Sequence, residues 1–325
     1  ALDHIALGQI ESIEPLLYHD AIAGPAAWAF IPVTAAGILW WAHNDDDGDR
    51  TPPNKPNTPE KFTDNEGNIK GDFPSGTVTD DKTPGIIIGP VPEGETPKLY
   101  VDGKEVPATY DPEKGTLTPD QPLPEGPHNI TYTVTDKAGN ESEPSDPIKV
   151  IVDTTAPEKP KTPEEFIDNI APQEGTFPNG SETNDTTPGI IIGPVKEGET
   201  PKLYVDDKEV PATYDPEKGT LTPTNPLPDG PHNITYTVTD PAGNESEPSD
   251  SIKVIVDTTA PNKPKAPEEF VDNIAPQEGT FPSGSETNDT TPGIVIGSVS
   301  EGEIPKLYVE GKEVPATYDP EKGTL

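Results

Sequence analysis

The chain has 325 residues with no cysteine and no methionine, and 59 acidic side chains against 22 lysines and arginines give a formal net charge of −37. Such a charge repels phosphate and argues against nucleic acid and nucleotides as partners, and the lack of cysteine excludes disulfides and thiolate metal sites. Leu, Ile, Val and Phe make up only about a fifth of the residues, a composition typical of disorder. The apolar residues nevertheless fall into short alternating runs, which favours a folded chain.

The first fifty residues differ from the rest. They contain no lysine and a single arginine, and residues 21–42 carry no charge and hold all three tryptophans. The segment is long enough for a membrane span, but Pro25 and Pro32 interrupt it and both flanks are acidic. Three interpretations stay open: a connector lodged in a membrane or secretion pore, a short packed hydrophobic segment, and a bilayer-spanning helix. We expect that it is not a membrane anchor by itself.

The remaining residues repeat with a period of 104. Val-Asp-Thr-Thr-Ala-Pro occurs at Val152–Pro157 and again at Val256–Pro261, and Lys104–Pro119 is identical to Lys208–Pro223. Repeat three stops at the equivalent of Leu221, which predicts a fragment of a longer array. The chain therefore divides into an N-terminal connector and three repeats, the third truncated: 1–50, 51–154, 155–258 and 259–325.

Each repeat has the pattern of short strands and turns. Ile130–Thr135 alternates apolar and polar residues, and Ile148–Val152 places a lysine opposite its apolar side chains. Lys98–Val101 alternates too and ends at the hairpin dipeptide Asp102-Gly103, while Gly85–Gly89 is typical of a buried central strand. Seven or so strands in about 100 residues predict an all-β fold of tandem immunoglobulin-like β-sandwiches, preceded by a short hydrophobic segment.

Four motifs resemble bacterial Ig-like repeats. They are Asp-Thr-Thr-Ala-Pro between repeats, Thr-Asn-Asp-x-x-Pro before the second strand, Tyr-Val-Asp-Gly in the third and Thr-Asp-x-Ala-Gly-Asn after the sixth. Repeats of this kind build the stalks of giant type I secreted adhesins of Gram-negative bacteria, including the biofilm-associated protein type. The resemblance implies a secreted, outer-membrane-associated protein of the cell surface that serves adhesion and biofilm formation. It also implies calcium ions that stiffen the domain junctions.

The repeated acidic residues form the candidate site. In an Ig-like sandwich the loop after the first strand and the end of the last strand share one pole, and the loop after the sixth strand lies at the other. At the first junction, Asp80, Asp81 and Asp153 should therefore face Asp240 and Asn244 of repeat two. Carboxylates that meet without a lysine or arginine repel one another, and Ca²⁺ with oxygen ligands resolves that repulsion.

The same reasoning assigns ligand candidates to the other junctions. The connector junction has Asp49, Asp136 and Asn140, and the second junction has Asp185 and Asp257. We expect weaker binding at the second junction, because the facing turn of repeat three lies beyond Leu325. The alternative is that these are solvated loops in which Asp and Gly serve turn geometry.

No enzyme motif can be assembled. The sequence contains no Ser-His-Asp arrangement, no dinucleotide-binding fingerprint and no phosphate loop. His128 and His232 occupy the same position of the repeat, which favours cap or turn residues over catalysts. We therefore expect a protein without catalytic activity.

The leading functional hypothesis is a calcium-stiffened stalk in which each repeat contacts its neighbours. A distal region would then contact the host surface or the biofilm matrix. In a second hypothesis the repeats themselves bind a host glycan or protein, for which the aromatic candidates are Tyr100, Tyr110, Tyr132, Phe62 and Phe73. A weaker third hypothesis is a spacer in a secreted hydrolase.

Overall fold

The computed structural model describes residues 28–30, 41–43 and 49–325, and within them it contains strands and no helix. Trp28–Phe30 (β1) pairs antiparallel with Trp41–His43 (β2). Most of segment 21–42 lies outside the described residues, so its three interpretations stay predictions. In the described part of the chain, no helix is long and apolar enough to cross a membrane.

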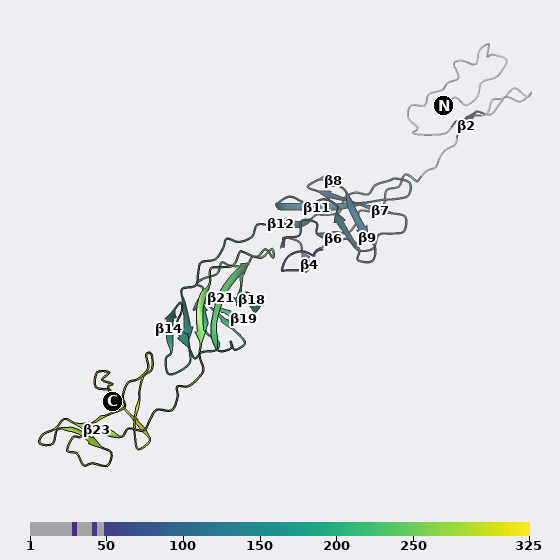
Figure 1. The fold of residues 1–325 in the computed structure, drawn as a ribbon. Coiled ribbons are helices and arrows are strands. Elements are labelled where there is room, and N and C mark those ends of the chain that lie inside the picture. Colours follow the sequence, from purple (N-terminus) through teal and green to yellow (C-terminus); the bar gives the residue numbers. More distant parts are fainter. Residues whose placement is uncertain (1–27, 31–40, 44–48) are drawn as a thin grey trace, which may run out of the picture. The chain divides into compact units, whose positions relative to one another are not determined.

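The first repeat is a two-layer β-sandwich (Figure 1). Its strands are β3 (Lys61–Asp64), β4 (Gly71–Pro74), β5 (Val78–Thr79), β6 (Gly85–Ile87), β7 (Thr96–Val101), β8 (Lys104–Val106), β9 (Ala108–Asp111), β10 (Thr116–Pro119), β11 (Gly126–Thr135) and β12 (Ile148–Val152). One sheet has the order β4-β3-β6-β10-β9 and the other β5-β12-β11-β7-β8, and all pairs are antiparallel except β5 with β12. These ten strands exceed the expected seven because short edge strands such as β4, β5 and β8 form without an alternating apolar pattern.

The second repeat has the same topology, as its near-identical sequence requires. Its strands are β13 (Glu165–Asp168), β14 (Gly175–Pro178), β15 (Glu182–Thr183), β16 (Gly189–Ile191), β17 (Thr200–Val205), β18 (Lys208–Val210), β19 (Ala212–Asp215), β20 (Thr220–Pro223), β21 (Gly230–Thr239) and β22 (Ile252–Val256). The sheets have the orders β14-β13-β16-β20-β19 and β15-β22-β21-β17-β18.

The described residues divide into two compact units, with the boundary between Thr258 and Thr259. The second unit contains a three-stranded sheet of order β24-β23-β25 and a two-stranded hairpin of β26 and β27. Its strands are β23 (Glu269–Asp272), β24 (Gly279–Pro282), β25 (Gly293–Ile294), β26 (Leu307–Val309) and β27 (Lys312–Val314).

The predicted all-β fold and its burial pattern are confirmed. In β12, Ile148 and Val150 are fully buried, and Lys149 between them is exposed. Strand β6 is the central strand of its sheet, as the apolar run at Gly85 indicated. The Asp102-Gly103 turn has φ values of 50° and 78°, the left-handed conformation that a two-residue hairpin turn needs.

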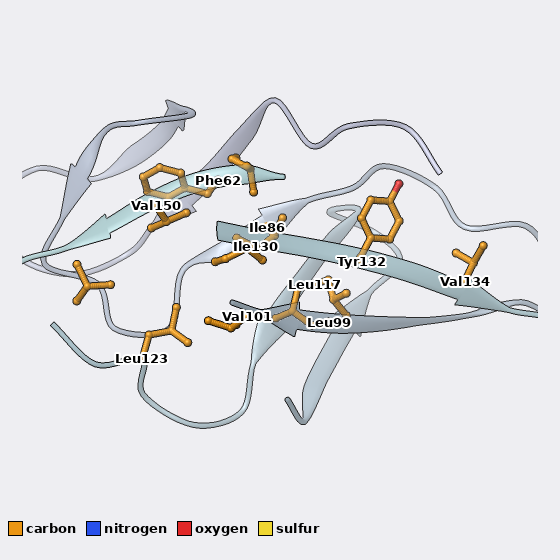
Figure 2. Packing of buried hydrophobic residues seen from close by; sticks show 12 residues of the cluster. Phe62, Ile86, Leu99, Val101, Leu117, Leu123, Ile130, Tyr132, Val134 and Val150 are labelled. Carbon is orange, nitrogen blue, oxygen red and sulfur yellow. The ribbon is translucent and has the colours of Figure 1, made fainter. Parts of the chain in front are cut away.

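The core of the first repeat lies between its two sheets (Figure 2). Phe62, Ile86 and Leu117 of one sheet meet Leu99 and Ile130 of the other, and all five side chains are fully buried. Each such side chain stabilises the fold by about 1.5–3 kcal/mol relative to an exposed position. This core holds the two ends of the sandwich, and therefore the acidic loops, at fixed positions.

Candidate functional site at the first repeat junction

The loop after the first strand of repeat one is closed by two buried carboxylates. Asp64 and Asp81 are 2% and 1% exposed. Asp64 Oδ2 accepts the Thr79 hydroxyl at 2.5 Å. Asp81 Oδ2 accepts the Asn65 N–H at 3.0 Å, and its Oδ1 accepts the Thr83 N–H at 2.8 Å. Both oxygens of the candidate ligand Asp81 therefore face backbone donors of its own loop.

The equivalent candidates of repeat two have the same surroundings. Asp185 accepts the Asn169 N–H at 3.1 Å and the Thr187 N–H at 2.8 Å, and it is 2% exposed. The Asp257 N–H donates to the Thr183 carbonyl at 2.9 Å. The Asp in the Thr-Asn-Asp-x-x-Pro motif thus closes its loop by accepting backbone N–H groups.

The turn after the sixth strand is closed by its own aspartate. Asp240 Oδ1 accepts the N–H groups of residues 242–244, each at 2.9 Å, and Oδ2 accepts Asn244 Nδ2 at 3.0 Å. Asp136 accepts the Asn140 N–H at 2.8 Å and Nδ2 at 2.9 Å. The bonds from Asn140 hold the pKa of Asp136 below its usual value. The Asp-x-Ala-Gly-Asn motif is therefore a hydrogen-bonded turn in both complete repeats.

The asparagine of each turn also binds the linker that enters its repeat. Asn244 Nδ2 donates to the Asp153 carbonyl at 2.8 Å, and Asn140 Nδ2 donates to the Asp49 carbonyl at 2.6 Å. The carboxylates of Asp153 and Asp49 each accept the N–H two residues further on, at 3.0 Å. These contacts tie Asp49 to its turn and Asp153 to repeat two through backbone carbonyls.

Asp80 has the least satisfied carboxylate at the junction. Its N–H donates to the Ala242 carbonyl of repeat two at 3.1 Å, but its buried Oδ1 has no hydrogen-bond partner in the described part of the chain. Burial and the neighbouring carboxylates of Asp64, Asp81 and Asp240 raise the pKa of Asp80 to about 6. The structure therefore brings Asp80 beside the Asp240 turn, as the pole argument predicted, and leaves one of its two carboxylate oxygens, Oδ1, without a hydrogen-bond partner among the described residues.

The described residues do not by themselves form a calcium shell. Within this part of the chain, no group of three or more His, Cys, Asp or Glu side chains is arranged to hold a metal ion. Ca²⁺ takes about six to eight oxygen ligands. The oxygens of Asp81, Asp185 and Asp240 already accept N–H donors. The calcium assignment stays a prediction, and Asp80 Oδ1 is the unpartnered carboxylate oxygen that supports it.

Three residues at this junction were missed by sequence reasoning. Gly67 and Asn68 of repeat one and Lys202 of repeat two contribute contacts described below. A signal for two of them exists in the sequence, because Gly67 and Asn68 are replaced by Ala171 and Pro172 in repeat two. At Asn68, where the two repeats differ in sequence, repeat one makes a hydrogen bond to repeat two.

The strand orders and the 104-residue period define a tandem array of Ig-like β-sandwiches. The family described as "Bacterial Ig-like domain" matches residues 57–154 and 168–258, more than half of the chain. The chain therefore belongs to the bacterial Ig-like domain family. No curated protein matches the chain.

Several solved structures are distantly similar. The fibronectin(III)-like modules of Clostridium thermocellum CbhA have 16% identity over 56% of this chain and 90% of theirs, with a TM-score of 0.31. SGBP-B of the Bacteroides ovatus mixed-linkage glucan utilization locus, solved with a heptasaccharide, has 18% identity over 59% of this chain and 46% of its own, with a TM-score of 0.20. Mouse cadherin-23 EC22–24 has 15% identity over 63% of this chain and 62% of its own, with a TM-score of 0.18. TM-scores this low carry no argument about function.

Proposed function

We propose that the chain is a spacer section in the stalk of a bacterial surface adhesin. The observation that carries the proposal is the direct joining of two near-identical sandwiches. The linker into repeat two is bound to that repeat, because Asn244 holds the Asp153 carbonyl and Lys159 pairs with Asp250 at 2.7 Å. A tandem array whose repeats contact their neighbours produces length, which is what a stalk requires.

The use of the aromatic residues supports a spacer over a receptor-binding module. Phe62 and Tyr132 are 0% and 4% exposed, and Phe73 packs against the core. The Tyr110 hydroxyl donates to the Gly89 carbonyl at 2.9 Å, and the Tyr100 hydroxyl donates to Glu141 at 2.5 Å. Every aromatic candidate of repeat one is thus engaged in packing or internal hydrogen bonds.

The distance between the membrane and the far end of the chain tests the proposal. The whole chain would be displayed on bacteria through an outer-membrane anchor, with a fluorescent tag at its far end. Inserting further copies of residues 155–258 should move the tag away from the membrane in equal steps. A distance that does not grow with copy number would contradict the spacer function.

Direct binding separates the spacer from the receptor hypothesis. The purified 325-residue chain would be applied to an array of mammalian glycans and to immobilised extracellular-matrix proteins. A spacer should show no saturable binding to either surface. Saturable binding that is lost on replacing Tyr100 or Tyr110, which are half-buried, would favour the receptor hypothesis.

We also propose a secreted, cell-surface location, a part in adhesion and biofilm formation, and the absence of catalysis. The four motifs that resemble adhesin repeats support these proposals. Labelling of intact cells with antibodies against repeat two tests the location. Labelling that appears only after the cells are permeabilised would contradict it.

Calcium at the first junction is a separate part of the proposal. It is supported by the unpartnered Asp80 Oδ1 and by the carboxylates that raise the pKa of Asp80. Ca²⁺ supplied there would neutralise charge that the described side chains do not neutralise. Calcium binding at the junction is measured by calorimetry, and the rigidity of the junction is measured by the distance distribution between the two repeats.

A further inference from the structure

We propose that repeat one carries an interface built for the repeat that follows it, and that this interface joins the two domains by direct hydrogen bonds without a metal ion. We name it the first-junction interface. Its residues are Gly67, Asn68 and Asp80 of repeat one and Lys202, Ala242 and Gly243 of repeat two. The inference rests on the proposed spacer function for its biological meaning, since it would set the geometry of neighbouring repeats.

Four hydrogen bonds cross the first-junction interface. The Asn68 N–H and Nδ2 donate to the Gly243 carbonyl at 3.4 and 3.1 Å. The Asp80 N–H donates to the Ala242 carbonyl at 3.1 Å. Lys202 Nζ, which also pairs with Glu245 at 3.1 Å, donates to Asn68 Oδ1 at 2.9 Å. Three of these bonds end on the adjacent backbone carbonyls of Ala242 and Gly243. Because they hold backbone atoms, they fix the position of the turn relative to repeat one.

The burial of the turn differs between the two repeats. Ala138 and Gly139 of repeat one are exposed. The equivalent Ala242 is 1% exposed and Gly243 is buried as well. Since the two turns share their internal hydrogen bonds, the difference reflects coverage of the second turn by repeat one.

Glycine leaves room for neighbouring atoms on both sides of the first-junction interface. A Cβ atom on Gly243 would lie 3.2 Å from the Ile69 nitrogen and 3.3 Å from Asp80 Oδ2. A Cβ atom on Gly67 would lie 1.7 Å from Asp80 Oδ2. Both glycines also have positive φ values, of +105° and +58°. The turn therefore approaches the loop of repeat one closely at Gly243, while Gly67 leaves room within repeat one for the Asp80 side chain.

The corresponding loop of repeat two lacks these donors. Pro172 stands at the position of Asn68 and offers neither an N–H nor a side-chain amide. Asn184 stands at the position of Asp80, and its Nδ2 donates to Ala171 within its own repeat at 3.1 Å. The loop of repeat one therefore carries donors to a following repeat that the loop of repeat two lacks, so the two copies are not interchangeable in order.

Spin labels on the whole chain test the interface. The protein has no cysteine, so Lys114→Cys and Lys218→Cys introduce two unique sites at equivalent positions of repeats one and two. Both lysine side chains are exposed, at 76% and 69%. In EDTA, pulsed electron paramagnetic resonance should give a narrow distance distribution for the otherwise unaltered chain. Gly243→Ala should broaden it by roughly twofold, because domains without a specific interface move relative to each other.

The matched control is Gly139→Ala. Gly139 has a φ of +91°, similar to Gly243, but a Cβ atom there would meet no atom within 4 Å. This variant should share the backbone strain of Gly243→Ala and keep the narrow distribution. Asn68→Ala removes two side-chain hydrogen bonds from repeat one and should also broaden it, even if Gly243→Ala unfolds repeat two.

Two results would overturn the inference. One is a distribution of unaltered width in both Gly243→Ala and Asn68→Ala. The other is a broad distribution for the unaltered chain in EDTA that narrows only when CaCl₂ is added, which would assign the junction to the ion. The spacer function is tested separately, by the distance of the fluorescent tag from the membrane in the display experiment.

Discussion

His128 is a buried imidazole whose two nitrogens both face acceptors. Nδ1 lies 2.7 Å from Asp102 Oδ2, and Nε2 lies 2.8 Å from the Pro124 carbonyl oxygen. Both can be satisfied only if each nitrogen carries a proton. Burial lowers the pKa of His128, but the bonds to Asp102 and Pro124 outweigh burial and leave the pKa above its ordinary value. His232 has the same arrangement with Asp206 and Pro228.

This pair of histidines predicts a dependence of stability on pH. A histidine whose pKa is raised in the folded state stabilises the fold at pH values below its unfolded pKa of about 6.5. This stabilisation is lost as the pH rises through the folded pKa. The pKa of Asp102 is lowered, chiefly by the His128 bond, so the carboxylate keeps its charge in this range. Urea unfolding should therefore show a more stable chain at about pH 5.5 than at about pH 8.5.

Replacing both histidines with glutamine is the control for this prediction. The double variant His128→Gln, His232→Gln should be less stable at the lower pH and should show a smaller difference between the two pH values, the remainder coming from the raised pKa of Asp80. Equal pH dependence of the variant and the unaltered chain would show that other groups are responsible.

Asp80 predicts opposite effects of one substitution with and without calcium. Asp80→Asn removes a partly buried charge that has an unpartnered oxygen, and Asn is the residue found at position 184. In EDTA the variant should be more stable by about 1 kcal/mol, a value reduced by solvent screening. Millimolar CaCl₂ should stabilise the unaltered chain and not the variant. Equal calcium effects on both proteins would remove Asp80 from the ligands.

At the scale of single elements, strand β12 connects the sequence pattern to stability. Ile148 is fully buried in the core and Lys149 is exposed beside it. Ile148→Ala should destabilise repeat one by about 2–5 kcal/mol, because it removes buried methyl groups and leaves a cavity. Lys149→Ala should change stability by no more than about 0.5 kcal/mol. Denaturant unfolding followed by tyrosine fluorescence measures both, and equal effects would contradict the assigned faces.

The turn after the sixth strand of repeat two stabilises itself and also contacts the linker between the repeats. The Asp240 carboxylate closes its turn internally, and Asn244 of the same turn binds the linker carbonyl of Asp153. Because the turn is prefolded by its own aspartate, its carbonyls are presented to repeat one without further ordering. This preorganisation lowers the entropy cost of joining the two repeats.

At the scale of the whole molecule, calcium would act by mass action on the folded state. An ion present at a hundred times its dissociation constant stabilises the protein by about 2.7 kcal/mol. The melting temperature of the full chain should therefore fall when EDTA replaces millimolar CaCl₂, and it should fall less for Asp153→Ala. Calorimetry that detects no calcium binding at millimolar concentration, with one melting temperature in both buffers, would show that the calcium prediction is wrong.

The strands and the fold class could be predicted from the sequence because they depend on local periodicity. Alternation in Ile148–Val152 decides which side chains face the core, and Asp102-Gly103 decides where a hairpin turns. The period of 104 residues carried these assignments from one repeat to the next. Edge strands such as β5 were not predicted, because their pairing is set by the neighbouring strand and not by their own pattern.

The candidate site depended on contacts between distant residues, and here only the tertiary structure could decide. The pole argument correctly placed Asp80 beside the Asp240 turn, but the sequence does not say which oxygen meets which N–H. Asp80 and Asp81 are adjacent in the chain, yet Asp81 accepts two backbone donors and Asp80 Oδ1 accepts none. Asn68 meets Gly243 across 175 positions. The physical reason is that hydrogen bonds are satisfied within about 3 Å, a scale set by the packing of whole domains and not by the order of residues.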